Sequence, residues 1–202
     1  MTRDPILLGT RSPGKLRELE PLFAAHGLPV IDLDAAGVPV SPAEDSVETY
    51  ATFEENALAK ARYYFERTSR ASVADDSGLS VDALGGAPGV FSKRWSGRRD
   101  LSGQALDDEN NRLLIERLSG VSDRSARYVC AAAFADGNGE LVECGEVVGR
   151  ILEVAHGNNG FGYDPFFYSV ELGRTFGEAS REEKERVSHR GRAFRRLLSR
   201  IR

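Results

Sequence analysis

The chain has 202 residues, of which 41% are hydrophobic and 29% are charged, and its formal net charge is −4. This length and balance predict a single domain over residues 1–202 that buries a core, with room for two lobes around a cleft. The acidic balance argues against a nucleic-acid partner. No stretch approaches the roughly 18 apolar residues of a membrane span.

The first half of the chain alternates between short apolar runs and amphipathic segments. The large apolar residues between Leu16 and Phe23 recur at three- and four-residue spacing, which is the period of an α-helix. Strands are expected over residues 5–10, 30–31 and 72–76, and helices over residues 15–26 and 52–67. Residues 33–48 show no period, so we expect an exposed acidic loop there.

The second half adds antiparallel signals. The expected elements are a helix over residues 101–118, strands over residues 127–135 and 140–152, and a last helix from Ser188 to Ile201. The turn at residues 136–139 between the two strands is a strong hairpin signal. A glycine-rich loop follows at residues 157–165, and Ser180 with Glu183 fits a capping box for a short helix. Together these patterns predict an α/β fold with a mixed sheet.

The two cysteines, Cys130 and Cys144, lie 14 residues apart and show no CxxC spacing. This pattern favours neither a zinc site nor a disulfide framework, so we expect reduced, packed thiols. The first ten residues contain too short an apolar run for a secretory signal, and we expect a cytoplasmic protein.

Charge is distributed unevenly along the chain. Residues 32–55 carry seven acids and no Lys or Arg, whereas residues 186–202 carry seven arginines and no acid. An acidic end and a basic end would suit a metal and a polyanion, although this pattern taken alone favours ordinary surface charge.

The segment from Gly9 to Lys15 matches a Walker A loop through its lysine, but Leu16 stands where a Ser or Thr would hold Mg²⁺. Free backbone N–H groups at a helix start and the charge of Lys15 would still suit phosphate oxygens. An ordinary strand-to-helix connection explains the segment equally well.

Adjacent aspartates follow the apolar run that starts at Ser72. Asp75 and Asp76 precede Ser77–Gly78, so we expect the strand to end there and to bring negative charge to a sheet edge, where divalent cations collect. A solvated turn is the alternative, because Asp, Ser and Gly are common turn formers.

Three further segments carry candidate residues. On the helix that starts near Thr52, Glu55 or Asn56 shares a face with Lys60, although an exposed salt-bridged helix is the favoured explanation. The aromatics of residues 161–165 could stack on a base or pack inward. Residues 188–191, with Lys184 before them, could bind an anion or a carbonyl oxygen, although a lone His at a cap often has no function.

The order of these motifs along one chain resembles the inosine triphosphate pyrophosphatase family. The resemblance runs from residue 6 to about residue 198 and rests on TRSPGK, TFEENALAKA, ADDSGLSVDALGGAPGVFSKRW, GFGYDPFF and EEK…SHRGRA. It implies an α/β fold of two lobes with a long mixed β-sheet flanked by helices and a central cleft, and a homodimer. It also implies Mg²⁺-dependent hydrolysis of XTP, ITP or dITP to the monophosphate and pyrophosphate. In the first motif, Ser12 replaces the usual asparagine of the family.

The resemblance also implies residue roles. Asp76 is expected to be the base for the attacking water or a ligand that positions metal-bound hydroxide, with Asp75 supporting the metal shell. Mg²⁺ would be held by Asp76 and by Glu48, which we choose over Glu44. Arg190 would donate to the purine keto oxygen. The expected substrate-binding residues are Thr10, Arg11, Ser12, Pro13, Gly14, Lys15, Lys60, Ser77, Phe161, Gly162, Tyr163, Asp164, Lys184, His189 and Arg190.

Two other functions are consistent with parts of the sequence. A P-loop-like NTPase or nucleotide kinase would rest on residues 9–15, and Leu16 counts against it. A nucleotide-binding regulator would use the same residues without turnover, and would have no need of the aspartate pair.

Overall fold

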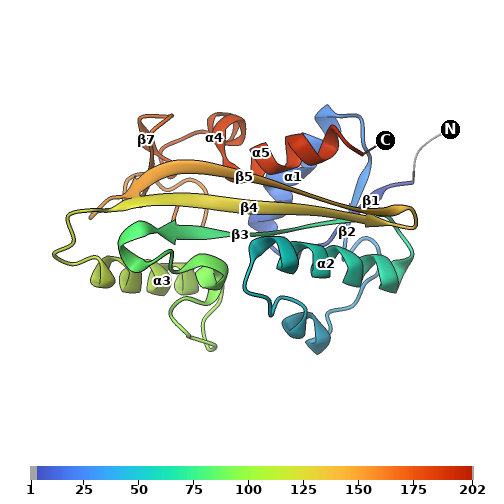
Figure 1. Cartoon of the computed structure of the whole chain (residues 1–202), viewed down its shortest axis with the longest axis horizontal. Coiled ribbons are helices and arrows are strands. Elements are labelled where there is room, and N and C mark those ends of the chain that lie inside the picture. Colours follow the sequence, from blue (N-terminus) through green and yellow to red (C-terminus); the bar gives the residue numbers. More distant parts are fainter. Residues whose placement is uncertain (1–3, 202) are drawn as a thin grey trace. The chain divides into compact units, whose positions relative to one another are not determined.

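The structure, a computed structural model, describes residues 4–201 (Figure 1). It contains a seven-stranded sheet in the order β2-β1-β3-β4-β5-β6-β7. The strands are β1 (Ile6–Leu8), β2 (Val30–Asp32), β3 (Ser72–Val81), β4 (Ser125–Asp136), β5 (Gly139–Ile151), β6 (Phe167–Ser169) and β7 (Arg174–Thr175). The helices are α1 (Pro13–Ala25), α2 (Phe53–Thr68), α3 (Gly103–Arg117), α4 (Arg181–Val187) and α5 (His189–Leu198), with short 3₁₀ turns at Pro42–Ser46, Asp82–Leu84 and Gly89–Arg94.

The sheet is mixed, as the sequence predicts. β1 pairs in parallel with β2 and β3, whereas β6 pairs antiparallel with β5 and β7. β4 and β5 are neighbours joined by the expected tight turn, where Asp136 accepts hydrogen bonds from the N–H groups of Asn138 and Gly139. The α/β prediction is therefore confirmed. None of the helices within residues 4–201 combines the length and the apolar character that a bilayer crossing requires.

The described chain divides into two compact units. The first unit comprises residues 4–76, 130–145 and 190–201, and the second comprises residues 77–129 and 146–189. Strands β3, β4 and β5 contribute residues to both units. The cleft that the family resemblance implies stays a prediction.

The core of the first unit has two layers of side chains, one on each face of the sheet. α1 and α5 pack on one face, where the rings of Phe23 and Phe194 meet edge to face at 5.8 Å and contact Val73 of β3 (Figure 1). α2 covers the other face, where Ala57 packs near Ala74. Successive strand residues point to opposite faces. The residues that follow Val73 and Ala74 must therefore also alternate.

The second unit has its own apolar core. It gathers side chains from β3, β4, β5, β6, α3 and α4 around the ring of Tyr128, which lies 4.6 Å from the ring of Phe167. Leu79 and Val81 of β3 belong to this core and are fully buried.

This burial explains why one prediction is wrong. The sequence places the end of a strand at Asp76, but β3 continues through Ser77 and Gly78 to Val81. Ser and Gly are frequent in turns, yet here the buried Leu79 and Val81 keep the chain extended. The two aspartates therefore lie inside a strand.

The acidic segment is also more structured than predicted. Residues 33–48 include a buried Leu33 and the 3₁₀ turn Pro42–Ser46, which begins with a capping box between Ser41 and Glu44. The predicted capping box at Ser180 and Glu183 is present at the start of α4.

Both cysteines are free thiols, as predicted. Burial, together with a hydrogen bond from the Cys144 thiol to Glu54, raises the pKa of Cys144 to about 12. Because the thiolate is the reactive form, we expect iodoacetamide to alkylate Cys144 at pH 8.5 at least about a hundredfold more slowly than free cysteine. Glu54→Gln should accelerate the reaction. Alkylation at the rate of free cysteine in the folded protein would contradict this prediction.

Candidate active site

The loop that follows β1 is fixed by its backbone contacts. The Gly9 N–H donates to the Val73 carbonyl at 2.7 Å, and a Cβ at Gly9 would lie 2.7 Å from the ring of Tyr64, so a larger residue does not fit. Ser12 caps α1 by accepting from the Lys15 N–H at 3.4 Å, and Pro13 occupies the first helical turn. The predicted strand–turn–helix is therefore present, and the N–H of Gly14 is the first-turn donor of α1 that Ser12 leaves available.

Lys15 reaches from this turn to β3. Its Nζ lies 3.2 Å from the Asp75 carbonyl oxygen and 3.1 Å from Asp75 Oδ2. Burial lowers the pKa of Lys15, and the Asp75 carboxylate opposes this effect. The first unit thus holds this ammonium group beside the two aspartates.

Asp75 is the centre of an ion-pair network on the face covered by α1 and α5. Its side chain is fully buried, and Oδ2 also accepts from Arg190 Nε at 3.1 Å. Burial would raise the pKa of Asp75, but Lys15 and Arg190 outweigh it and hold the pKa well below its usual range. The Asp75 carboxylate thus serves as the counter-ion of two buried cations, and its expected support of a metal shell stays a prediction.

Arg190 has two carboxylate partners that the sequence did not predict. It is 3% exposed, and its NH1 pairs with Glu18 of α1 while its Nε binds Asp75. Its guanidinium therefore serves first to neutralise carboxylates, and its contact with a purine keto oxygen stays a prediction. Sequence reasoning missed Glu18, although its position three residues after Lys15 on the same helix could have indicated it.

Asp76 points to the opposite face and meets α2. Asn56 is 1% exposed, and its Nδ2 donates to Asp76 Oδ2 at 2.9 Å. The same amide bonds both the N–H and the C=O of Tyr50, which fixes its orientation. The sequence placed Asn56 on a face with Lys60, but an exposed helix was the favoured explanation, and the contact with Asp76 was not predicted.

Glu48 and Lys60 complete the charged cluster of the first unit, which comprises Lys15, Glu48, Asn56, Lys60, Asp75, Asp76 and Arg190. Glu48 Oε1 and Lys60 Nζ form an ion pair. Burial raises the pKa of Asp76, the charge of Glu48 adds to the rise, and Lys15 and Lys60 oppose it. The two acids are thus close enough to repel each other, as acids that share a cation would be.

Glu44, the alternative to Glu48, is already bonded elsewhere. Arg11 donates to both Glu44 oxygens, at 3.0 and 3.2 Å, and also to Asp34 and to the Val38 carbonyl. All three guanidinium nitrogens of Arg11 therefore hold the acidic segment. The substrate contact expected of Arg11 stays a prediction, and the engagement of Glu44 by Arg11 favours Glu48 as the metal ligand.

The charged cluster can hold a hard cation such as Mg²⁺ only if substrate phosphate oxygens or water complete the coordination. Within residues 4–201, no three His, Cys, Asp or Glu side chains are placed to bind a metal by themselves. Mg²⁺ usually takes one or two carboxylates together with phosphate oxygens and water. Asp76 and Glu48 fit this requirement.

In the second unit, the segment Phe161–Asp164, called the 161–164 loop below, is held by its own aspartate. Asp164 Oδ2 accepts from the Phe161 N–H at 2.9 Å and from Lys184 Nζ at 2.6 Å. A Cβ at Gly160, where φ is +78°, would lie 2.0 Å from the same oxygen, so only glycine fits. The aromatic ring of Phe161 is thereby fixed at the loop's start.

Lys184 is buried in this arrangement. Besides its ion pair with Asp164, its Nζ lies 4.9 Å from the centroid of the Phe161 ring and 5.4 Å from that of Phe176. These are cation–π distances. The structure thus gives Lys184 a role in supporting Phe161, and its contact with phosphate stays a prediction.

The other expected residues of the second unit are also packed. The Tyr163 hydroxyl donates to the Ser92 carbonyl at 2.8 Å, and the His189 ring stacks on Tyr128 with centroids 4.6 Å apart. Ser77 is half-buried in β3. The backbone of Gly162 is bonded to two side chains of α3 that sequence reasoning missed, Asp107 and Asn111.

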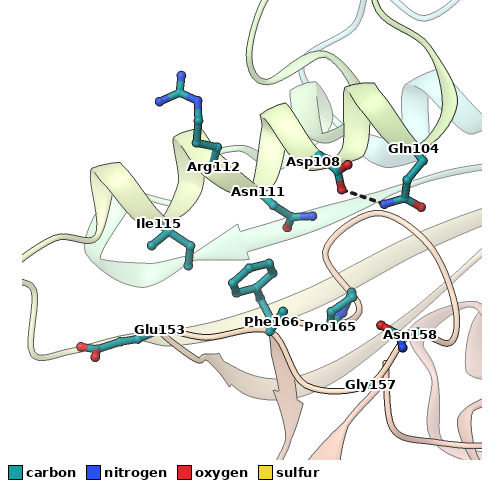
Figure 2. Close-up of a pocket in the computed structure, with 11 residues that line it drawn as sticks. Gln104, Asp108, Asn111, Arg112, Ile115, Glu153, Gly157, Asn158, Pro165 and Phe166 are labelled. Atoms are coloured by element: carbon teal, nitrogen blue, oxygen red, sulfur yellow. Dashed lines mark hydrogen bonds between the residues drawn. The ribbon is translucent and has the colours of Figure 1, made fainter.

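A separate hollow of about 520 Å³ lies along α3 in the second unit (Figure 2). Ile115, Pro165 and Phe166 form its apolar lining, and Asn111 reaches into it from α3. None of the predicted substrate-binding residues lines it. The candidate active-site residues are instead those of the charged cluster and of the 161–164 loop.

Comparison with known proteins identifies similar chains. The model of the Ham1 family matches residues 6–200. A dITP/XTP pyrophosphatase of Mycolicibacterium paratuberculosis is 48% identical over 200 residues, which cover 96% of this chain and 94% of that protein. Among solved structures, a HAM1 protein from Coxiella burnetii is 36% identical, with a TM-score of 0.83 and 98% of both chains covered. A nucleoside-triphosphatase (dITP/XTP pyrophosphatase) from Mycobacterium abscessus is 42% identical, with a TM-score of 0.72 and 98% and 100% covered.

Proposed function

Because the chain belongs to the Ham1 family, we propose that it hydrolyses non-standard purine nucleoside triphosphates such as dITP, ITP and XTP to the monophosphate and pyrophosphate. Relatives that match nearly its whole length carry the name dITP/XTP pyrophosphatase. The observation that carries the proposal is the charged cluster, which places the ammonium groups of Lys15 and Lys60 near the carboxylates of Asp76 and Glu48. All residues of this cluster except Glu48 lie in the sequence motifs that resemble the inosine triphosphate pyrophosphatase family.

The first unit supplies the groups that suit a triphosphate. The N–H of Gly14 at the start of α1, together with the side chains of Lys15 and Lys60, binds phosphate oxygens. Asp76 and Glu48 would hold Mg²⁺, and the bound ion would supply positive charge to offset the charge that develops on the pyrophosphate leaving group. Asp76 accepts the proton of the attacking water, and Asn56 holds its carboxylate in one orientation.

The second unit supplies the groups that suit a purine. The ring of Phe161 stacks on the base. Asp164 holds the Phe161 N–H, and Lys184, which pairs with Asp164, contacts the Phe161 ring. Tyr163, His189 and Ser77 complete the nucleoside contacts. Hypoxanthine and xanthine carry a hydrogen-bond acceptor at position 6, where adenine carries a donor. A hydrogen-bond donor of the protein that faces position 6 therefore favours hypoxanthine and xanthine over adenine.

Product analysis tests this proposal. Purified protein with ITP and Mg²⁺ should release pyrophosphate and IMP, and excess EDTA should stop the release. The kcat/KM for ATP should be lower than for ITP by at least about fivefold, since an unpaired buried donor costs about 1–3 kcal/mol. Orthophosphate as the first product, or equal rates with ATP, would contradict the proposal.

The two alternative functions predict different outcomes in the same assay. A P-loop NTPase or kinase would release orthophosphate or transfer the γ-phosphate, and Leu16 packs against the core of the first unit, where it offers no ligand to a metal. A nucleotide-binding regulator would bind ITP without any product. The homodimer and the cytoplasmic location stay predictions.

A further inference from the structure

We propose that Asp107 and Asn111 of α3 are positioning residues that hold the 161–164 loop and thereby set the affinity of the enzyme for the purine base. This inference rests on the proposed function and deepens it, because it assigns base affinity to a helix outside every predicted motif. It concerns the second unit alone.

The two side chains hold one peptide segment from both sides. Asp107 Oδ2 accepts from the Gly162 N–H at 2.8 Å, and Asn111 Nδ2 donates to the Gly162 carbonyl at 2.9 Å. They lie four residues apart on α3, so both project from the same face. The donor and the acceptor of one glycine are thus both satisfied by this helix.

Gly162 is the part of the loop that most needs such restraint. Its φ is +63°, and a Cβ built there would meet nothing within 4 Å, so side-chain packing does not fix it. Glycine has the widest backbone freedom of any residue, so the two hydrogen bonds to Gly162 are what restrain it. Its neighbours, Phe161 and Tyr163, are the residues expected to meet the nucleoside.

Asp107 and Asn111 together are called the clamp. The helix that carries them, α3, is itself fixed in the second unit. Leu114 is fully buried in the core of the second unit. Asn110 accepts from the Ser96 N–H at 2.8 Å and donates to the Lys93 carbonyl at 3.1 Å. Asn111 itself is 6% exposed, and Figure 2 shows it reaching from α3 toward Pro165 and Phe166. Because α3 is fixed in this way, its hydrogen bonds to Gly162 can hold the 161–164 loop in one position.

The expected consequence is a change in binding and not in the chemical step. Without the clamp, Gly162 would be free to rotate, and the Phe161 ring would spend less time in the position that stacks on a base. The groups that we assign to the chemistry, Asp76 and Glu48, belong to the other unit. Loss of the clamp should therefore raise KM and leave kcat nearly unchanged.

Asp107→Ala and Asn111→Leu test the clamp, with Asp108→Ala as the matched control. Asp108 is the next residue on α3, is exposed, and bonds only to Gln104 among the hydrogen bonds drawn in Figure 2. We expect KM for ITP to rise about tenfold in each clamp variant, with kcat within about twofold of wild type. Asp107→Asn, which keeps an acceptor oxygen, should restore most of the affinity.

Amide hydrogen exchange provides a readout that does not depend on activity. Residues 157–166 of the substrate-free clamp variants should exchange about tenfold faster than in wild type or in Asp108→Ala, whereas the strands of the second unit should be unchanged. Clamp variants that match Asp108→Ala in both KM and exchange would overturn the inference, as would an equal loss of kcat with KM unchanged. Wild-type protein that fails to cleave ITP would instead overturn the proposed function, and exchange would still decide on the clamp.

Discussion

Replacing Asp76 with asparagine is expected to lower the rate of pyrophosphate release from ITP at least about a hundredfold, because a positioned general base contributes about 10²–10⁴ to such a rate. The amide cannot accept the proton of the attacking water, and it is a poorer ligand for Mg²⁺ than a carboxylate. The measurement is kcat/KM for ITP at saturating Mg²⁺.

The same substitution should leave the fold intact. Burial raises the pKa of Asp76, which means that the charged carboxylate is disfavoured in the folded protein. An asparagine removes that cost, and its carbonyl oxygen can still accept the hydrogen bond from Asn56. We therefore expect the free energy of unfolding in urea to be unchanged or slightly higher.

A surface aspartate of the acidic segment provides the control. Asp45 is exposed and is not a member of the charged cluster, so Asp45→Asn removes the same charge without changing a group of the cluster. This control should keep wild-type turnover. Turnover by Asp76→Asn within about fivefold of wild type would remove Asp76 from the chemistry.

The sequence indicated which segments carry the chemistry, because glycine turns, capping residues and charged residues follow local rules. Lys15, Glu48, Lys60 and Asp76 are brought together as expected. The hairpin and most helices were likewise predictable, since their periods and turns are contained in short windows.

The partners of those residues could not be predicted, because they depend on which faces meet across long sequence separations. Asn56 lies 20 residues from Asp76, Glu18 lies 172 residues from Arg190, and Asp107 lies 55 residues from Gly162. No local pattern links such pairs. The extension of β3 through Ser77 and Gly78 was missed for the same reason, since the core of the second unit decides it.

The adjacent aspartate, Asp75, is expected to show the opposite behaviour from Asp76. Asp75→Asn leaves Lys15 and Arg190 buried beside a neutral amide, and breaking a buried ion pair in this way costs about 3–5 kcal/mol. We therefore expect the free energy of unfolding, measured in urea at pH 7, to fall by that amount. Glu18→Gln, which removes only the outer partner of Arg190, should cost about 1–3 kcal/mol.

The pH dependence gives this prediction a second test. The pKa of Asp75 is held below its usual range against the effect of burial, so its contribution to stability is present above the unfolded pKa of about 3.9 and is lost as the pH falls toward the folded value. The stability difference between wild type and Asp75→Asn should therefore be constant near neutral pH and shrink below about pH 4. A difference of less than about 1 kcal/mol at pH 7 would contradict the assignment of Asp75 as the counter-ion of two cations. Alternation along β3 directs these neighbours to opposite faces. Asp75 therefore pairs with the buried cations on one face, and Asp76 lies on the other face, where we propose that it acts on the substrate.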